Sequence, residues 1–361
     1  MTFPLVAPAI FAGGILCVLD SLAAFGAPAA IGFPANMHVL TTKIYHLLAH
    51  PPRFQLAAAV SLPIIFFTGI CLFAQKWYLG RTKFTTLTGK VGSAQGMDLG
   101  RWKWAAFGGC FAVIFVSVIL PMGGLIILSL LKTFGASIAF TNFTVTNYEI
   151  FFDESFLVWP SVQNSFMLAI STASLCILFS IVYVWLVERT TIPGRGIITA
   201  LIMITFGFPA VAMGVAILLG YINLLYGTLW IILVAYIAKR IPFAYIFLRS
   251  AIKQIMEELE EAARICGASW LRSVKDITVP LMKTGMVAAW ILVFSISLRE
   301  LAMSILLYQP GNEVMAVAIF SFLEDGSVEH AAAVGVLVAL LSVLTVVIAR
   351  KVAGKGALEV E

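Results

Sequence analysis

The sequence predicts an all-α polytopic membrane protein with about eight transmembrane helices. Of its 361 residues, 61% are hydrophobic and 11% are charged, whereas an ordinary soluble domain carries about 25% charged residues. Apolar stretches recur along the chain at about 20 residues each, the length that crosses the hydrocarbon of a bilayer. We expect spans near residues 4–22, 54–74, 104–131, 162–187, 197–219, 227–248, 284–306 and 331–349.

Two of these stretches contain residues that are unusual in a membrane helix. Residues 227–248 include Lys239 and Arg240, so we expect either a short span or a kinked cytoplasmic end from which both cations reach the headgroups. The preceding stretch contains Gly207, Pro209 and Gly214. These indicate either a bend or close helix packing through small residues, and we prefer the packing interpretation.

The positive charges predict the orientation. Of the 23 Lys and Arg residues, 19 lie in four alternate connections, namely 75–103, 188–196, 239–283 and 350–361. Positive residues concentrate on the cytoplasmic side of a membrane protein, so both termini are expected to be cytoplasmic. The net charge of +5 reflects the same bias and gives no reason to expect nucleic acid as a partner.

Other function classes lack support in the residues. The sequence shows no Cys and His spacing typical of a metal site, no phosphate-binding glycine loop and no nucleophile arrangement. We therefore expect no catalytic residue, no resident cofactor and no metal, and the chain is not predicted to be an enzyme.

An island of charge, residues 257–280, separates two of the predicted spans. Apolar residues recur in it at helical spacing, namely Ile255, Met256, Leu259, Ala262 or Ala263, and Cys266. The other faces hold Glu257, Glu258, Glu260, Glu261 and Arg264, so an amphipathic helix is predicted. Gly267 predicts its end, a second short helix follows, and Pro280 suits the first turn of the next span.

Six positions of this island carry a family resemblance. Glu261, Ala262, Ala263, Gly267, Ile277 and Pro280 stand at the spacings of the EAA motif, with Val279 where the motif has leucine. The motif is typical of the inner-membrane permease subunits of binding-protein-dependent ABC importers, which this chain resembles. In that family the loop docks on the cytoplasmic ATPase. The resemblance thus implies that residues 250–283 are a coupling loop; a solvated connector is the alternative interpretation.

The resemblance also implies the partners and the location. The chain would be a multi-pass protein of the cell inner (plasma) membrane, and its partners would be a cytoplasmic ABC ATPase dimer, a periplasmic or surface solute-binding protein, and a second permease half or a second copy of this chain. ATP hydrolysis would belong to the ATPase. The alternative function from another class is an ion-coupled secondary transporter, which would need buried carboxylates or broken helices.

The solute class follows from resemblance alone. Residues 88–90 and 98–102 are similar to the joint between the halves of tandem iron(III)-type permeases. This similarity implies iron(III) as the solute, ahead of thiamine, polyamine or phosphonate.

Arg299 and Glu300 are the candidate residues of a translocation path. They fall within the seventh predicted span, where an ionisable side chain costs several kcal/mol unless it is paired or faces water. A position near the outer interface is the alternative explanation.

An internal repeat predicts the domain organisation. At an offset of 276 residues, eight of 21 positions near the N-terminus are identical to residues 278–298, and the same offset brings the second span onto the last. We expect residues 1–74 to be the last two spans of a truncated first repeat. Residues 75–103 would be a cytoplasmic linker and residues 104–361 a complete six-span permease domain of the type I ABC importer class. A first EAA motif would then belong to a longer gene product, unless a second copy of this chain supplies the other coupling loop.

Overall fold

The computed structural model describes residues 2–49, 51–81, 100–136, 139–153 and 158–353. Apart from one isolated bridge between Leu131 and Phe143, these residues form helices, turns and loops without strands. Five helices are long and apolar enough to cross a membrane, and there are up to eight such spans if each of three bent helix pairs counts as one. The predicted all-α class is confirmed, and the predicted eight spans match the upper count.

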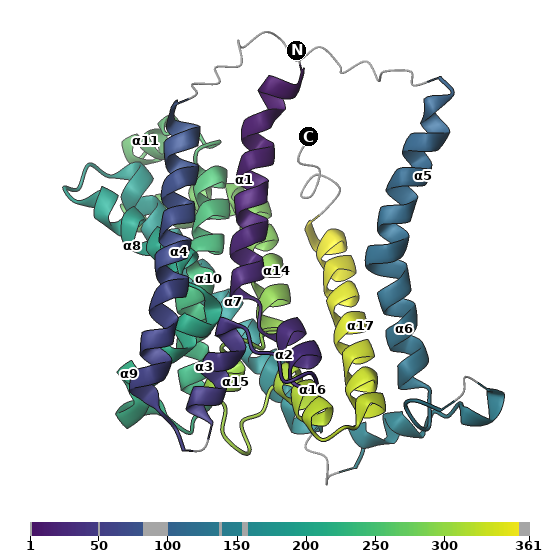
Figure 1. Ribbon diagram of the computed structural model, residues 1–361. Coiled ribbons are helices and arrows are strands. Elements are labelled where there is room, and N and C mark those ends of the chain that lie inside the picture. The colour runs from purple at the N-terminus through teal and green to yellow at the C-terminus, as the bar shows by residue number, and fades with distance from the viewer. Residues whose placement is uncertain (1, 50, 82–99, 137–138, 154–157, 354–361) are drawn as a thin grey trace.

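Figure 1 shows the helices in a bundle with one arm set to the side. In chain order they are α1 (Thr2–Ala23), α2 (Gly26–Gly32), α3 (Leu40–Leu48), α4 (Phe54–Arg81), α5 (Trp102–Ile114), the π-helix η1 (Phe115–Ile119), α6 (Leu120–Ser129), the 3-10 helices η2 (Phe140–Asn142) and η3 (Thr146–Phe151), α7 (Val158–Arg189), α8 (Arg195–Gly207), α9 (Ala210–Leu225), α10 (Leu229–Ile252), α11 (Glu258–Ile265), α12 (Trp270–Ser273), the π-helix η5 (Val274–Thr278), α13 (Val279–Leu281), α14 (Lys283–Leu298), α15 (Ser304–Leu307), α16 (Met315–Glu324) and α17 (Val328–Ala353).

The centre of the bundle is formed by α7, α10 and α14, which pack on one another. Their shared core includes the fully buried Tyr245, Leu248 and Ala289. A second core joins α9, α10, α15 and α16 to α2, α3 and α4, so the N-terminal helices are attached to the rest by apolar packing. The close approach of α10 and α14 depends on Gly285, because a Cβ atom there would lie 2.7 Å from the Cβ of Ala251.

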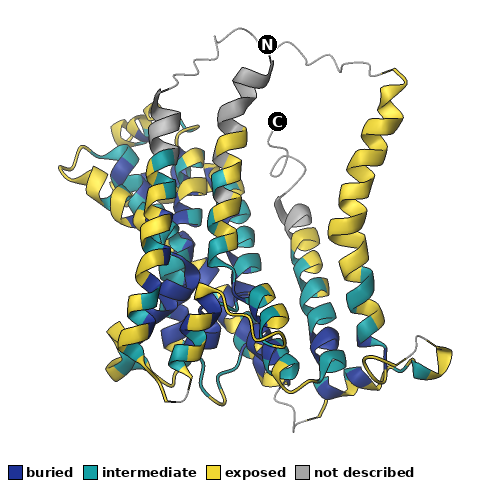
Figure 2. Ribbon diagram, viewed as in Figure 1, coloured by how far each residue is buried: buried dark blue, intermediate teal, exposed yellow. Residues whose placement is uncertain are grey.

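The arm formed by α5, η1 and α6 contacts the bundle through α17. None of the residues in its most apolar window is buried, and Figure 2 shows α5 exposed along its length. Helices that are apolar on all sides are stable where lipid or protein covers them, so this arm fits a membrane-spanning segment.

Two predicted spans are interrupted in the structure, and a third is longer than one of its expected alternatives. The stretch 197–219 is divided into α8 and α9, which meet at a bend of 112°. The stretch 284–306 is also interrupted, because α14 ends at Leu298 and α15 begins at Ser304. By contrast, 227–248 is not short, since α10 runs through it without interruption; Pro242 lies within this helix, and the expected kink stays a prediction.

The helix order at the N-terminus recurs at the C-terminus. Residues 302–308, 316–324 and 330 onward, which the 276-residue offset pairs with α2, α3 and α4, overlap α15, α16 and α17. One difference is that α1 is continuous, whereas its counterpart is bent by 70° between α13 and α14. Of the predicted linker 75–103, residues 82–99 lie outside the described part of the chain.

The close approach at Gly285 gives a stability prediction. Gly285→Ala forces α10 and α14 apart or displaces Ala251, and overpacking of this kind costs about 1–3 kcal/mol. We expect a lower melting temperature for the detergent-solubilised protein, followed by tryptophan fluorescence. Gly220→Ala in α9 is the control, because a Cβ there meets no atom within 4 Å. Equal melting temperatures for the two variants would contradict the predicted contact.

Candidate functional site

The break between α8 and α9 interrupts the membrane-embedded core. α8 ends at Gly207, Phe208 is extended, and α9 starts directly after Pro209. A residue that precedes proline is disfavoured in the helical region, which explains why the helix stops here. Gly207 also lies in close contact with α4, because a Cβ atom there would displace the end of the Leu72 side chain. The bend and the close packing, treated as alternatives from the sequence, therefore occur together.

Lys239 of α10 donates hydrogen bonds to the backbone carbonyl groups that have no helical partner at this break. Its ammonium donates a hydrogen bond to the carbonyl of Phe206 at 3.3 Å and another to the carbonyl of Phe208. The last carbonyls of a helix have no partner within it, and a cation there also offsets the helix dipole. The predicted snorkelling of Lys239 towards the headgroups is therefore wrong, since the side chain is fixed at the break.

Arg240, the next residue of α10, forms a buried ion pair with Glu300. The guanidinium donates to Oε2 of Glu300, and Oε1 accepts the backbone N–H of Met303 at 3.4 Å. Arg240 thus does not reach the headgroups either. Removing one partner of such a pair leaves an uncompensated buried charge, which costs about 3–5 kcal/mol. Glu300 is held within the bundle, which does not fit the interfacial explanation of this residue.

Two hydroxyl groups support the chain beside this pair. The Tyr236 hydroxyl lies 2.6 Å from Oγ of Ser304 and 3.2 Å from the carbonyl oxygen of Glu300. The Ser304 hydroxyl also lies 2.8 Å from that carbonyl. The non-helical turn between α14 and α15 is therefore fixed to α10 by side chains and backbone together.

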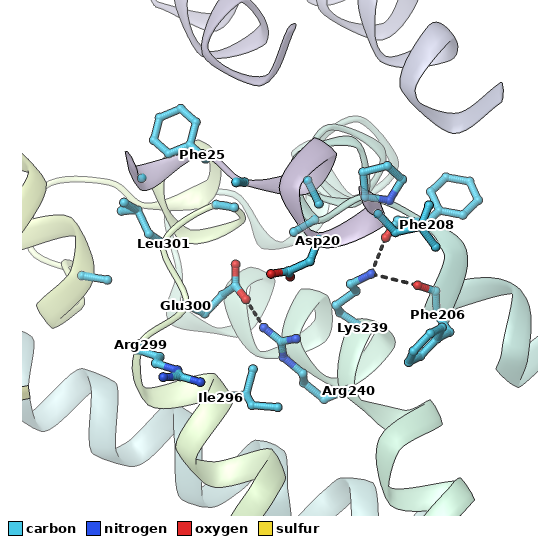
Figure 3. A pocket seen from close by; sticks show the side chains of 18 of the residues that line it. Asp20, Phe25, Phe206, Phe208, Lys239, Arg240, Ile296, Arg299, Glu300 and Leu301 are labelled. Atoms are coloured by element: carbon cyan, nitrogen blue, oxygen red, sulfur yellow. Dashed lines mark hydrogen bonds and ion pairs between the residues drawn. The ribbon is translucent and has the colours of Figure 1, made fainter. Parts of the chain in front are cut away.

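These elements surround a cavity of about 790 Å³, which we name the central cavity. It is lined by parts of α1, α2, α4, α8, α9, α10, α14, α16 and α17, with the turn that follows α14. Figure 3 shows its charged side chains, which are Asp20, Lys239, Arg240, Arg299 and Glu300. Both candidate path residues from the sequence, Arg299 and Glu300, thus lie in one cavity, and the remaining wall is mostly apolar.

The predicted coupling loop begins where α10 ends, and Arg189 at the end of α7 holds it. Its guanidinium contacts Oε1 of Glu257 at 2.9 Å and Oε1 of Glu260 at 3.3 Å. It also donates to the backbone carbonyls of Ile252 and Ile255, at 3.1 and 2.6 Å. These four contacts, which we name the Arg189 clamp, join the loop to α7.

The burial of side chains on and around α11 differs from the predicted polar and apolar faces. Glu260, placed on a polar face by the sequence pattern, is buried and accepts a hydrogen bond from Thr278 at 2.8 Å. Met256, Leu259 and Ile265 are instead exposed, at 71, 45 and 86%. The loop therefore carries apolar side chains on its outer surface.

Gly267 ends α11 with a backbone that favours glycine. Its φ is +87°, its N–H donates to the carbonyl of Arg264, and the N–H of Ala268 donates to that of Ala263. This is the Schellman arrangement of a helix C-terminus. The chain then continues through α12 and the π-helix η5, in which Thr278 is placed beside Glu260.

The motif residues of the loop are largely accessible. Glu261, Ala262, Gly267 and Pro280 are exposed, and Ala263 and Ile277 are half-buried. Sequence reasoning missed the roles of Arg189, Lys239 and Arg240. A signal for the last two was present, because adjacent cations inside an apolar helix require partners. Among the described residues, no group of three or more His, Cys, Asp and Glu side chains could hold a metal ion.

Comparison with known proteins gives a family for the second half of the chain. Residues 193–355 match the family model described as "Binding-protein-dependent transport system inner membrane component". This segment contains the α8–α9 break, α10, the coupling loop and all helices that follow.

Curated relatives are transport permeases with different named solutes. The chain is 24% identical over 353 residues, 96% of its length, to the ferric transport system permease protein FbpB of Actinobacillus pleuropneumoniae and spans 50% of that protein. It is 31% identical over 140 residues to the putative 2-aminoethylphosphonate transport system permease protein PhnV of Salmonella typhi, which covers 38% of this chain and 53% of that one. The spermidine/putrescine transport system permease protein PotC of Escherichia coli is 22% identical over 250 residues, 68% of this chain and 93% of PotC.

The chain thus spans about half the length of the first two relatives. A solved bacterial ABC transporter involved in the import of the acidic polysaccharide alginate has a chain of the same fold. The TM-score is 0.55 at 18% identity, over 70% of this chain and 95% of that one. Within this multi-pass, all-α protein, the match to the family of binding-protein-dependent transport system inner membrane components thus covers residues 193–355.

Proposed function

We propose that this chain forms part of the solute path of an ATP-driven importer and receives its driving force from a separate ATPase through residues 250–283. The observation that carries the proposal is the coupling loop itself. It is clamped to α7 by Arg189 and stabilised within by Glu260 and Thr278. At the same time it exposes apolar side chains such as Ile265. A rigid base with an unpartnered apolar surface suits docking on another protein.

The mechanism follows from these attachments. The ATPase dimer would close on binding ATP and move the two coupling loops of the assembled importer. Because the Arg189 clamp joins this loop to the ends of α7 and α10, the movement would reach the centre of the bundle. The spans would then alternate between inward-facing and outward-facing packings as rigid bodies, exposing the central cavity with Arg299 and Glu300 to each side in turn.

The other partners belong to the same proposal. A solute-binding protein would deliver solute at the outer face, and a second permease half or a second copy of this chain would provide the other coupling loop. The repeated helix order supports a division into residues 1–74, a linker at 75–103 and a permease domain at 104–361. Iron(III) is the proposed solute, supported by the extent of similarity to FbpB; phosphonate and polyamine are the alternatives that relatives suggest.

The ion-coupled secondary transporter is a weaker candidate. Two features that it needs are present, a broken helix pair and a buried carboxylate. However, Glu300 is neutralised by Arg240, and the carbonyl groups at the break are occupied by Lys239. A coupling cation would have to displace both basic side chains. ATP dependence of uptake in the absence of ion gradients distinguishes the two functions.

The coupling role predicts a specific effect at Gly267. In Gly267→Val a non-glycine residue must adopt positive φ, at a cost of about 1–2 kcal/mol or more. We expect the variant to insert normally but to transport roughly tenfold less solute per ATP hydrolysed, because about 1.4 kcal/mol shifts an equilibrium tenfold. The measurement is paired uptake and ATPase activity in proteoliposomes with the cognate ATPase.

Gly194→Val is the matched control, since Gly194 also has φ +87° and lies in the connection between α7 and α8. A loss of coupling in both variants would indicate general destabilisation. Normal coupling in Gly267→Val would show that the loop has no such role.

The proposed orientation predicts the reactivity of Cys266, which is exposed on the coupling loop. A membrane-impermeant maleimide should label it in inverted vesicles but not in intact cells, and docking of the ATPase should slow the reaction. Cys266→Ser gives the background from the other cysteines. Labelling of Cys266 from outside intact cells would reverse the orientation.

The solute assignment can be tested with the reconstituted importer. If iron(III) is the solute, ATP-driven uptake and stimulation of the ATPase should require an iron-loaded binding protein. Binding proteins loaded with thiamine, a polyamine or a phosphonate serve as comparisons. Stimulation by one of these and not by the iron-loaded protein would replace iron(III) as the solute.

A further inference from the structure

The charges of the central cavity do not cancel. Arg240 and Glu300 neutralise one another as an ion pair. Lys239 is hydrogen-bonded to the backbone carbonyls of Phe206 and Phe208, and the Asp20 carboxylate also lines the cavity. The lining thus holds three cations and two carboxylates, so one positive charge is in excess, and Arg299 is the cation with no hydrogen bond or ion pair among the described residues.

Arg299 is also available for binding. It is exposed, it lies where the chain leaves α14, and the described part of the chain gives its side chain no hydrogen-bond or ion-pair partner. In Figure 3 no dashed line joins the guanidinium of Arg299 to another residue drawn. A guanidinium presents five N–H donors in a planar fork that fits two oxygens of a carboxylate, phosphate or phosphonate.

A second donor lies in the same wall. The Nε–H of Arg240 is buried and has no hydrogen-bond partner among the described residues. The apolar lining lowers the local dielectric constant, which strengthens the attraction of an anion to the guanidinium of Arg299.

We propose that Arg299 binds an oxyanion group of the transported solute, so that the species crossing the central cavity carries an anionic group. This inference rests on the proposed importer function and narrows its solute class. A polyamine would meet an uncompensated positive charge in this cavity. Bare iron(III) would find no cluster of ligands among the described residues. A phosphonate, or iron(III) within a negatively charged complex, matches the available donors.

The electrostatic potential of the cavity can be measured without knowing the solute. In a background lacking the five native cysteines, Ala302→Cys places a thiol on the cavity wall, and Ala23→Cys places one on the side formed by α1. The purified chain in detergent is treated with two methanethiosulfonates of similar size, one bearing a sulfonate and one an ammonium group. The ratio of the two rates is compared, because the fraction of a cysteine present as thiolate affects both rates equally and cancels.

We expect the ratio of the sulfonate rate to the ammonium rate to be higher at these two cysteines than with a free thiol such as 2-mercaptoethanol. Arg299→Gln should remove this preference. One unit charge about 8 Å away, at an effective dielectric constant of about 40, changes the rate of each reagent roughly fivefold in opposite directions. Arg299→Lys should keep most of the preference. Arg53→Gln, the same change at an exposed position outside the cavity, should leave it unaltered.

The opposite results overturn the proposal. A preference for the ammonium reagent, a ratio that Arg299→Gln does not change, or a failure of both cysteines to react would each show that Arg299 provides no anion site in an accessible cavity. Different results would refute the proposed importer function. An anion preference without ATP-driven uptake would exclude the importer, whereas ATP-driven uptake of putrescine would exclude the anion site and retain the importer.

Discussion

The pairing of Arg240 with Glu300 is the interaction on which the arrangement of the core depends. It joins the middle of α10 to the end of α14, two of the three helices at the centre of the bundle. Two apolar side chains could hold these helices as firmly. They could not, however, accept the N–H of Met303 or hold a guanidinium at the cavity wall. The ion pair therefore determines the shape of the turn as well as the packing.

Two adjacent residues of α10 stabilise the two places where neighbouring helices are interrupted. Successive residues of a helix point about 100° apart, so Lys239 reaches the end of α8 while Arg240 reaches the turn after α14. Both interruptions border the central cavity. Non-helical backbone at membrane depth is tolerated where its polar groups are satisfied by protein or face a cavity. One continuous helix, α10, thus supports two broken ones.

Composition and apolar spacing were sufficient to predict the helical class and the segments that cross the membrane. The turn at Gly267 was also predictable, because a helix C-terminus with positive φ requires this residue type locally. The partners of Lys239 and Arg240 were not, since they lie in helices distant along the chain. The burial of Glu260 was missed for the same reason: periodicity describes one helix, whereas Arg189 reaches it from the end of another.

The π-helix η5 has a consequence for the spacing of the motif between Gly267 and Pro280. A π turn holds about one residue more than an α turn, so it takes up an extra residue without rotating the side chains that follow around the helix axis. This extra residue helps to set the face on which Thr278 meets Glu260. If the same residues of Val274–Thr278 were wound as a regular α-helix, every later side chain would be rotated by roughly 100° relative to the residues before Val274. The fixed number of residues in this part of the motif is thus a constraint on rotation, in addition to any requirement for particular side chains.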